Sequence, residues 1–363
     1  MNKPSSIPLL PEFRKFILAS RTGRRLMPSG RKIRKSTIAN YETTFILLSR
    51  FEKRFGEPLQ IQFVHRASLR QSDQVRHYWQ QVYKKFLDFL YQQRNVYDNY
   101  AGSVLKVLKT FLRYLSLYRN LPTGDFYKTI HVPRESFIPA ILSPEQLRYL
   151  IADEEFAGTL SPTLRRIKDV FVFGCTVGLR YQDLMNLKKT NLQVSPAAVS
   201  LIQHTKKTGT EVCIPLPAYA ISILGRLKKR GSVYLLPRVA GSNFNMQVKK
   251  LIRAAGWDYY WPKYRQRRGE QIEIRTREGE PYRFYDHITA HTMRRTAITT
   301  LLLLGVDENT VRRISGHAPG SKEFYRYVVI SQDFLTKKIL DAYARLLSPD
   351  WDPALCGLKD KTS

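Results

Sequence analysis

Cysteine is scarce in this sequence of 363 residues, and long hydrophobic runs are missing. The three cysteines, Cys175, Cys213 and Cys356, are odd in number and far apart, which argues against a disulfide framework and a zinc knuckle. The apolar run Leu301–Leu304 is far shorter than the roughly 18 residues that a membrane span requires. The N-terminus, MNKPSSIPLLPEF, lacks the apolar centre of a signal peptide. These absences favour a protein of a reducing cytoplasm, with no membrane partner.

Acidic residues are few relative to basic ones. Sixty Lys and Arg stand against 30 Asp and Glu, which gives a formal charge of +30 spread along the chain. Such a field suits a polyanion, most simply nucleic acid. The sequence has no Walker A loop, no paired-carboxylate cluster and no Cys/His pattern with zinc spacing. Two-metal nucleases and ATP-driven enzymes are therefore poorly supported, and we expect neither a metal nor a cofactor.

The N-terminal third has the pattern of a small helical bundle. Residues 1–34 contain prolines, glycines and the stretch RTGRRLMPSGRKIRK, which predicts an extended basic arm. Apolar residues then recur every three or four positions in three segments, which predicts a helical domain over 35–120. The Pro-rich stretch 121–141 breaks this periodicity and is interpreted as an interdomain linker.

A second domain is expected over 142–347, followed by a tail at 348–363. Ser143-Pro144-Glu145-Gln146 has the form of a helix start with a capping box, and Ser161-Pro162 begins another helix that ends near Gly178. Two alternating runs around KKTG, in VSLIQHTKKTGTEVCIPL, predict a β-hairpin. The expected fold class is mainly α with a small β-hairpin or sheet, that is, α+β.

Chemistry-bearing residues gather in the second domain. His291 and Arg294 lie three apart at the start of the helix TAHTMRRTAITTLLLLG and therefore share one face. Gly316 closes a shorter helix, and His317 follows it. Upstream, one arginine follows a helix and one lysine lies on the predicted hairpin. The ordered set is Arg180, Lys207, His291, Arg294, His317 and Tyr327.

This ordered set resembles the catalytic residues of the tyrosine recombinases, the phage integrase family. The resemblance covers residues 143–340 well and 36–120 more weakly. It implies an N-terminal core-binding domain and a C-terminal catalytic domain that cleaves and rejoins DNA through a 3′-phosphotyrosyl bond. It also implies that His291 is the base, that His317 donates to a phosphate oxygen, and that Lys207 protonates the leaving 5′ oxygen.

The chemistry of phosphodiester cleavage requires these residue types, independently of the family resemblance. Attack by a hydroxyl builds a second negative charge on the phosphate, and the two arginines Arg180 and Arg294 can each donate twice to its oxygens. A tyrosine hydroxyl has a pKa of about 10 and needs a proton acceptor or a strong local field.

The nucleophile position departs from the family spacing. A gap of nine residues after His317 would fall on Arg326, whereas one extra residue in the preceding loop selects Tyr327. The ending FYRY then resembles the F-x-R-Y ending of integrases from Bacteroidetes mobile elements. Tyr327 is the predicted nucleophile, and Tyr325 is the alternative that the sequence leaves open.

Four further residues are candidates for supporting roles. Asp183 follows Arg180 by three residues and could orient its guanidinium, in agreement with an acidic residue at that place in the family. Lys106, Lys109 and Arg113 form a stripe on a predicted helix of the first domain. A solvated charged face and a phosphate contact explain this stripe equally well.

The function that follows is a site-specific recombinase, the integrase of a phage, conjugative element or transposon. A type IB topoisomerase, a resolvase of chromosome dimers and a catalytically inactive DNA-binding relative are the alternatives. The partners expected from the resemblance are double-stranded DNA and three further copies in a homotetramer on paired sites, in the bacterial cytoplasm. An accessory DNA-bending protein, the target sequence and the crossover spacing are left open.

Overall fold

A computed structural model of the chain describes residues 6–64, 69–135, 139–196, 198–205, 209, 211–317, 320, 324, 340, 343–344 and 347. The chain divides into two compact units. The first comprises Met1–Phe137 together with Lys263–Arg275, and the second comprises Ile138–Pro262 and Thr276–Ser363. The segment Lys263–Arg275 therefore interrupts the sequence of the second unit but belongs to the first unit.

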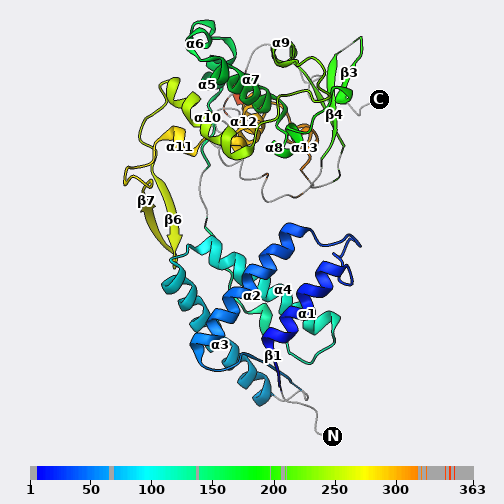
Figure 1. Ribbon diagram of the computed structural model, residues 1–363, viewed down its shortest axis with the longest axis vertical. Helices are drawn as coiled ribbons and strands as arrows, with labels where there is room; N and C mark the ends of the chain where they lie inside the picture. The colour runs from blue at the N-terminus through cyan, green and yellow to red at the C-terminus, as the bar shows by residue number, and fades with distance from the viewer. Residues whose placement is uncertain are drawn as a thin grey trace. The chain divides into compact units, whose positions relative to one another are not determined.

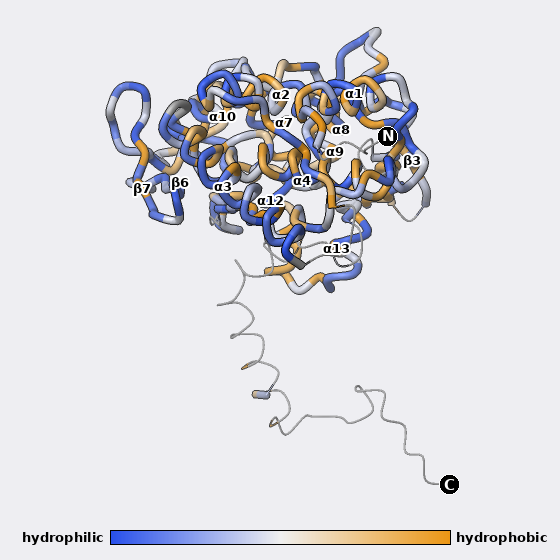
Figure 2. Tube along the Cα trace, turned by 90° about the horizontal axis from the view of Figure 1, so that it is seen from below, coloured by the Kyte–Doolittle hydropathy of each residue, from blue (hydrophilic) through white to orange (hydrophobic). Residues whose placement is uncertain are grey.

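The first unit is built from four helices and two small β-ribbons within the described residues (Figure 1). Its elements are β1 (Ser6–Pro8), α1 (Leu9–Thr22), α2 (Lys35–Phe55), β2 (Gln60–Gln62), α3 (Leu69–Arg94), α4 (Asp98–Tyr118), the 3-10 turn η1 (Phe126–Lys128), β6 (Lys263–Arg267) and β7 (Glu270–Ile274). β1 pairs antiparallel with β2, and β6 pairs antiparallel with β7. Figure 2 shows hydrophobic and hydrophilic positions alternating along these helices, whose apolar faces form one core.

The N-terminal segment differs from the expected arm. Leu9–Thr22 is helix α1, and its Phe13 and Phe16 side chains are fully buried against Phe111 of α4. Arg25, in the basic stretch that follows, lies over the Phe16 ring at 4.5 Å. The many basic residues of this region made the helix hard to recognise in the sequence. Apolar residues at a few positions on one face of a helix are enough to bury that face.

The expected linker is largely part of the first unit. Within residues 121–141 the side chains of Thr123, Phe126, Ile130 and Glu135 are buried, and the boundary between the units falls between Phe137 and Ile138. A Cβ on Gly102 of α4 would lie 2.0 Å from the Pro133 carbonyl oxygen. Only a glycine therefore permits this stretch to run so close to α4.

The second unit is mainly helical, with one three-stranded antiparallel sheet among its described residues in the order β3-β4-β5. The elements before the internal segment are α5 (Pro144–Ala152), α6 (Glu154–Thr159), α7 (Pro162–Val177), α8 (Tyr181–Leu184), the turn η2 (Lys189–Asn191), β3 (Leu192–Val194), β4 (Val199–His204), β5 (Glu211–Pro215), α9 (Ala218–Leu227) and α10 (Gly241–Ala254). After it come α11 (Phe284–His287), α12 (Ala290–Leu303) and α13 (Glu308–Ser315).

Helix α7 is the centre of the second core. Its start is the predicted one, since the Ser161 hydroxyl accepts from the Leu164 N–H, and the capping box of Ser143 and Gln146 likewise begins α5. α7 packs closely on α12 because Gly174 has no side chain: a Cβ there would lie 2.2 Å from Met293 Sδ. Gly178 ends α7 in the left-handed conformation, with φ of 64°.

These features confirm the predicted fold class, mainly helical with small sheets. No helix among the described residues is long and apolar enough to cross a membrane.

Candidate active site

Arg180 lies in the turn between two helices. Gly178 ends α7, and Arg180, with extended backbone, is the residue before α8. Its side chain is half-buried, and the Nη1 atom is buried with no hydrogen-bond partner among the described residues. A buried guanidinium nitrogen without an acceptor is costly, and a phosphate oxygen would satisfy it.

Asp183 is buried, with 2% of its surface exposed, one helical turn after Arg180. The turn is tight, because the Leu184 N–H donates to the Arg180 carbonyl over 2.8 Å. This places the carboxylate near the arginine backbone. Its contact with the guanidinium remains a prediction.

Arg294 is the largest fully buried side chain of the protein among the residues described, with 2% of its surface exposed. Its Nη1 donates to the Gly178 carbonyl oxygen over 2.9 Å. This bond ties α12 to the end of α7, two residues before Arg180. The close approach of the two helices at Gly174 is what brings the acceptor within reach.

His317 lies against Arg294, immediately after the left-handed Gly316 that ends α13. Arg294 Nη2 is 3.0 Å from His317 Nε2 and 3.2 Å from Nδ1. The lone pairs of the two ring nitrogens diverge, so one N–H cannot bond in the ring plane to both. We assign the bond to Nε2, because Nδ1 has another partner.

That partner is Ser315, a buried residue of α13. Its Oγ lies 2.6 Å from the Val311 carbonyl oxygen and 2.9 Å from His317 Nδ1. A hydroxyl has one proton, which the carbonyl takes, so Oγ accepts from an N–H at Nδ1. This arrangement places the neutral His317 proton on Nδ1 and leaves Nε2 facing Arg294.

The predicted Lys207 hairpin exists as β4 and β5, with His204 paired to Glu211 at the last described rung. The loop beyond it is closed by the Gly209 N–H, which donates to the Thr205 carbonyl over 2.8 Å. Thr205 is buried, and a Cβ on Gly316 would lie 3.3 Å from its Cγ2. The hairpin therefore packs on the helix end that precedes His317. Lys207 itself lies outside the described residues.

His291 lies in the first turn of α12, three residues before Arg294, with an exposed side chain. The structure thus brings Arg294 and His317 into contact and ties Arg294 to Gly178, two residues before Arg180. His291 lies on the first turn of the same helix as Arg294. Tyr327 and the alternative Tyr325 lie outside the described residues.

The basic stripe of the first unit lines a cleft of about 590 Å³, formed by Lys106, Lys109, Thr110, Arg113, Leu117, Tyr127 and Lys128. Lys106 and Arg113 are exposed. Lys109 has a structural contact, because its ammonium donates to the carbonyls of Lys128 and Ile130 over 3.1 and 3.3 Å. Lys106 and Arg113 are therefore the better candidates for a phosphate.

Two other nucleophilic side chains near the site are held in their neutral forms. Burial raises the pKa of the Tyr181 hydroxyl to about 12, and this hydroxyl donates to the Val239 carbonyl over 2.8 Å. Burial also raises the pKa of the Cys175 thiol in α7. Neither group is therefore suited to attack a phosphate at neutral pH.

Sequence reasoning did not select Ser315 or Gly178. Ser315 is two residues before the histidine, which is the only sequence signal that it offers. Gly178 was recognised as a helix end, but its role as an acceptor depends on α12, which lies more than 110 residues away in the chain. Among the described residues no cluster of His, Cys, Asp and Glu could hold a metal ion.

Comparison with known proteins identifies the family of the chain. The phage integrase family model matches residues 141–332, more than half of the chain. The chain belongs to the phage integrase family, the tyrosine recombinases, which are enzymes that cleave and rejoin DNA.

Two curated relatives are similar in sequence. The tyrosine recombinase XerD of Bifidobacterium longum is 22% identical over 237 residues, which are 63% of this chain and 71% of the relative. The tyrosine recombinase XerA of Thermococcus kodakarensis is 24% identical over 230 residues, 62% of this chain and 70% of the relative.

Solved structures share the fold. The XerH site-specific recombinase, in a post-cleavage complex with a palindromic difH substrate, has a TM-score of 0.56 at 15% identity over 91% of this chain and 84% of that chain. The integrase of transposon Tn1549, in complex with transposon right end DNA, has a TM-score of 0.54 at 15% identity over 88% and 94%.

Proposed function

We propose that this protein is a site-specific integrase that integrates or excises a mobile element through a 3′-phosphotyrosyl intermediate on Tyr327. The observation that carries the proposal is the buried Arg180 Nη1 without a partner among the described residues, two residues after the Gly178 carbonyl that binds Arg294. An anion with several acceptor oxygens, such as the scissile phosphate, would satisfy these donors.

The roles proposed are those that the family resemblance implies, and the contacts of Arg294 and His317 support them. Arg180 and Arg294 hold the non-bridging oxygens, and Arg294 is itself fixed by the Gly178 carbonyl, so it needs little reorganisation when DNA binds. When the His317 ring carries both protons, Nε2 no longer accepts from Arg294 and donates to the phosphate, while Nδ1 still donates to Ser315. Asp183 orients Arg180 from the start of α8.

Strand cleavage then balances as one displacement. The Tyr327 oxygen attacks phosphorus and its proton passes to His291, while the bond to the 5′ oxygen breaks and that oxygen takes a proton from Lys207. The phosphate stays on tyrosine until a 5′ hydroxyl attacks in the reverse reaction. Neither metal nor nucleotide is needed for this sequence of steps.

The DNA partner is proposed on two further observations. The chain has a charge of +30, and the cleft of the first unit exposes Lys106 and Arg113. Phosphate contacts of this kind give a steep salt dependence to binding. Assembly as a homotetramer on paired sites in the cytoplasm follows for a recombinase that exchanges two duplexes.

The test is a covalent trap on nicked DNA fragments from the source genome, without metal or ATP, resolved on a denaturing gel. Wild type should form an adduct at a 3′ phosphate, and Tyr327→Phe should abolish it while Tyr325→Phe does not. Loss with Tyr325→Phe alone would move the nucleophile. Tight binding without an adduct on any fragment would favour an inactive DNA-binding relative.

A resolvase of chromosome dimers is the second candidate, because both curated relatives are Xer recombinases. The two functions differ in their substrates. A resolvase should recombine two copies of one chromosomal site, whereas an integrase should join an element end to a separate target site. Relaxation of supercoils by a monomer at many sites would instead indicate topoisomerase activity.

A further inference from the structure

The hairpin β6–β7 comes from the sequence of the second unit but belongs to the first. It follows α10 and precedes α11, and yet residues 263–275 group with residues 1–137. Its turn has two residues, Arg268 and Gly269, with φ of 56° and 84°. Two consecutive positive φ values define a type I′ turn, the tight form that matches strand twist.

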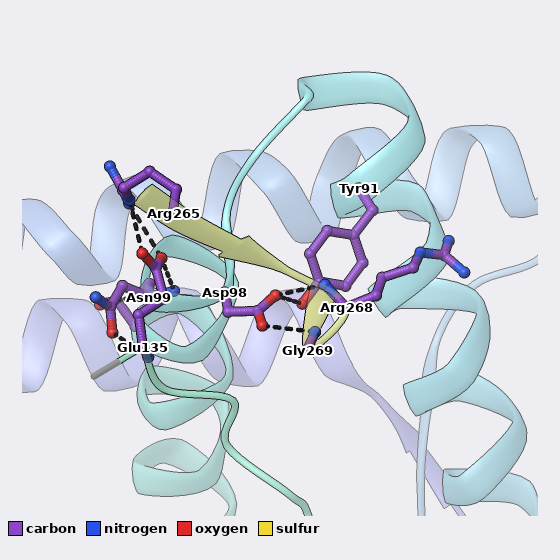
Figure 3. Close-up of polar contacts among 8 residues, drawn as sticks. Tyr91, Asp98, Asn99, Glu135, Arg265, Arg268 and Gly269 are labelled. Atoms are coloured by element: carbon purple, nitrogen blue, oxygen red, sulfur yellow. Dashed lines mark hydrogen bonds and ion pairs between the residues drawn. The ribbon is translucent and has the colours of Figure 1, made fainter. Parts of the chain in front are cut away.

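Asp98 receives the tip of this hairpin. It is the first residue of α4 and only 3% exposed. Oδ1 accepts from the Tyr91 hydroxyl over 2.6 Å and from the Arg268 backbone N–H over 2.8 Å, and Oδ2 accepts from the Gly269 N–H over 2.9 Å (Figure 3). Both contacts to the hairpin go to its backbone, so they require the carboxylate but not a particular side chain at the tip.

Glu135 forms a second attachment on the chain that leaves the unit. Its side chain accepts from the Asn99 N–H over 2.9 Å, and Arg265 of β6 donates to both of its oxygens over 2.7 and 3.1 Å (Figure 3). In turn, the Asn99 side-chain oxygen accepts from the Glu135 N–H. Two residues earlier, Pro133 lies against Gly102 of α4. The segment 132–135 is thus held between α4 and the hairpin.

We propose that hairpin β6–β7 is a splint that fixes the linker segment 132–135 on α4. The chain crosses between the units after Phe137, before Lys263 and after Arg275. Because Glu135 bonds to Arg265, and Arg265 pairs with Ile272 across the hairpin, the residues near all three crossings lie together. If the first unit binds DNA, as proposed above, the splint fixes where the chain leaves that unit for the catalytic one.

The experiment measures hydrogen exchange by mass spectrometry on the full chain without DNA, so its outcome does not depend on the proposed function. Asp98→Asn replaces one of the two acceptor oxygens by an NH₂ group. This group is a donor and cannot accept from the turn N–H or the Tyr91 hydroxyl that faces it. We expect exchange in 263–275 and in 132–135 to rise about tenfold or more, with helices α1 and α2 unchanged. Arg265→Gln, which removes the paired contact to Glu135 from a less buried position, should raise exchange in the same two segments.

Arg268→Asn is the matched control. It removes the exposed ion pair with Asp88 but keeps the backbone N–H, and asparagine suits the positive φ. Exchange should stay as in wild type. The proposal fails if 132–135 stays protected when the hairpin loosens, or if neither segment responds to Asp98→Asn and Arg265→Gln. Should Asp98→Asn not fold, Arg265→Gln alone decides between these results.

Discussion

Replacing Arg294 by lysine separates the geometry of the guanidinium from its charge. Arg294 is 2% exposed and uses two nitrogens on different partners, Nη1 on the Gly178 carbonyl at 2.9 Å and Nη2 on His317 Nε2 at 3.0 Å. Lysine keeps the charge but has one ammonium on a flexible chain and cannot reproduce the planar fork. Arg294→Lys should therefore fail in a way that charge alone does not explain.

Two magnitudes are expected. Leaving the buried Gly178 carbonyl without its donor should lower the free energy of unfolding by about 1–3 kcal/mol. Loss of one preorganised donor to the developing phosphate charge should slow cleavage by about 10²–10³-fold, or about 2.7–4 kcal/mol of activation free energy. The effect on cleavage should exceed the effect on stability. The stability effect comes from the Nη1 bond to the Gly178 carbonyl, whereas cleavage also depends on the guanidinium donors that face the phosphate.

The assay follows covalent adduct formation on nicked target DNA, and urea unfolding measures stability in parallel. Arg313→Lys is the matched control, since Arg313 is an exposed arginine of α13 and the same change there should alter neither quantity. A cleavage rate equal to wild type in Arg294→Lys would refute the assignment of Arg294 to the phosphate. A large loss of stability with unchanged cleavage would leave it a purely structural residue.

Three further predictions follow from contacts described above. Gly174→Ala places a Cβ 2.2 Å from Met293 Sδ and should destabilise the chain by about 1–3 kcal/mol in urea unfolding, whereas Gly225→Ala, where nothing lies within 4 Å, should not. Ser315→Ala removes the acceptor at His317 Nδ1 and should slow adduct formation and shift its pH profile, while Ser315→Thr should retain both. Burial alone would raise the pKa of Glu135, but hydrogen bonds from Arg265 and the Asn99 N–H, together with the Arg265 charge, hold it below its usual range. Its stabilising contribution should therefore be present above about pH 4.3 and disappear as pH falls through the lowered value, so that the stability difference between wild type and Glu135→Gln shrinks in acid.

The sequence allowed much of the helical framework to be predicted, because that framework depends on local signals. The capping box at Ser143 and the left-handed ends at Gly178 and Gly316 are determined within a few residues of themselves. The order of the predicted catalytic residues was recognised from family resemblance rather than from any such local rule.

What the sequence did not disclose depends on partners that are distant in the chain. The burial of the Asp98 carboxylate is explained by its bonds to a turn 170 residues later in the chain. Likewise, the basic stretch around Arg25 concealed that the preceding helix belongs to the core. A hairpin can be recognised from alternating residues, but the unit to which it attaches cannot be.

The segment from Gly174 to Arg180 shows why site geometry and stability are coupled in the second unit. Gly174 sets the distance between α7 and α12, Gly178 both ends α7 and accepts from Arg294, and Arg180 follows in the turn. A change at Gly174 would move the Gly178 carbonyl relative to Arg294 without altering any predicted catalytic side chain. Loss of cleavage in Gly174→Ala should therefore appear even under conditions where the chain is fully folded. If the cleavage rate falls only as far as the loss of folded protein explains, the contact between α7 and α12 serves only the core. The guanidinium of Arg294 is then positioned by its own hydrogen bonds and not by the spacing at Gly174.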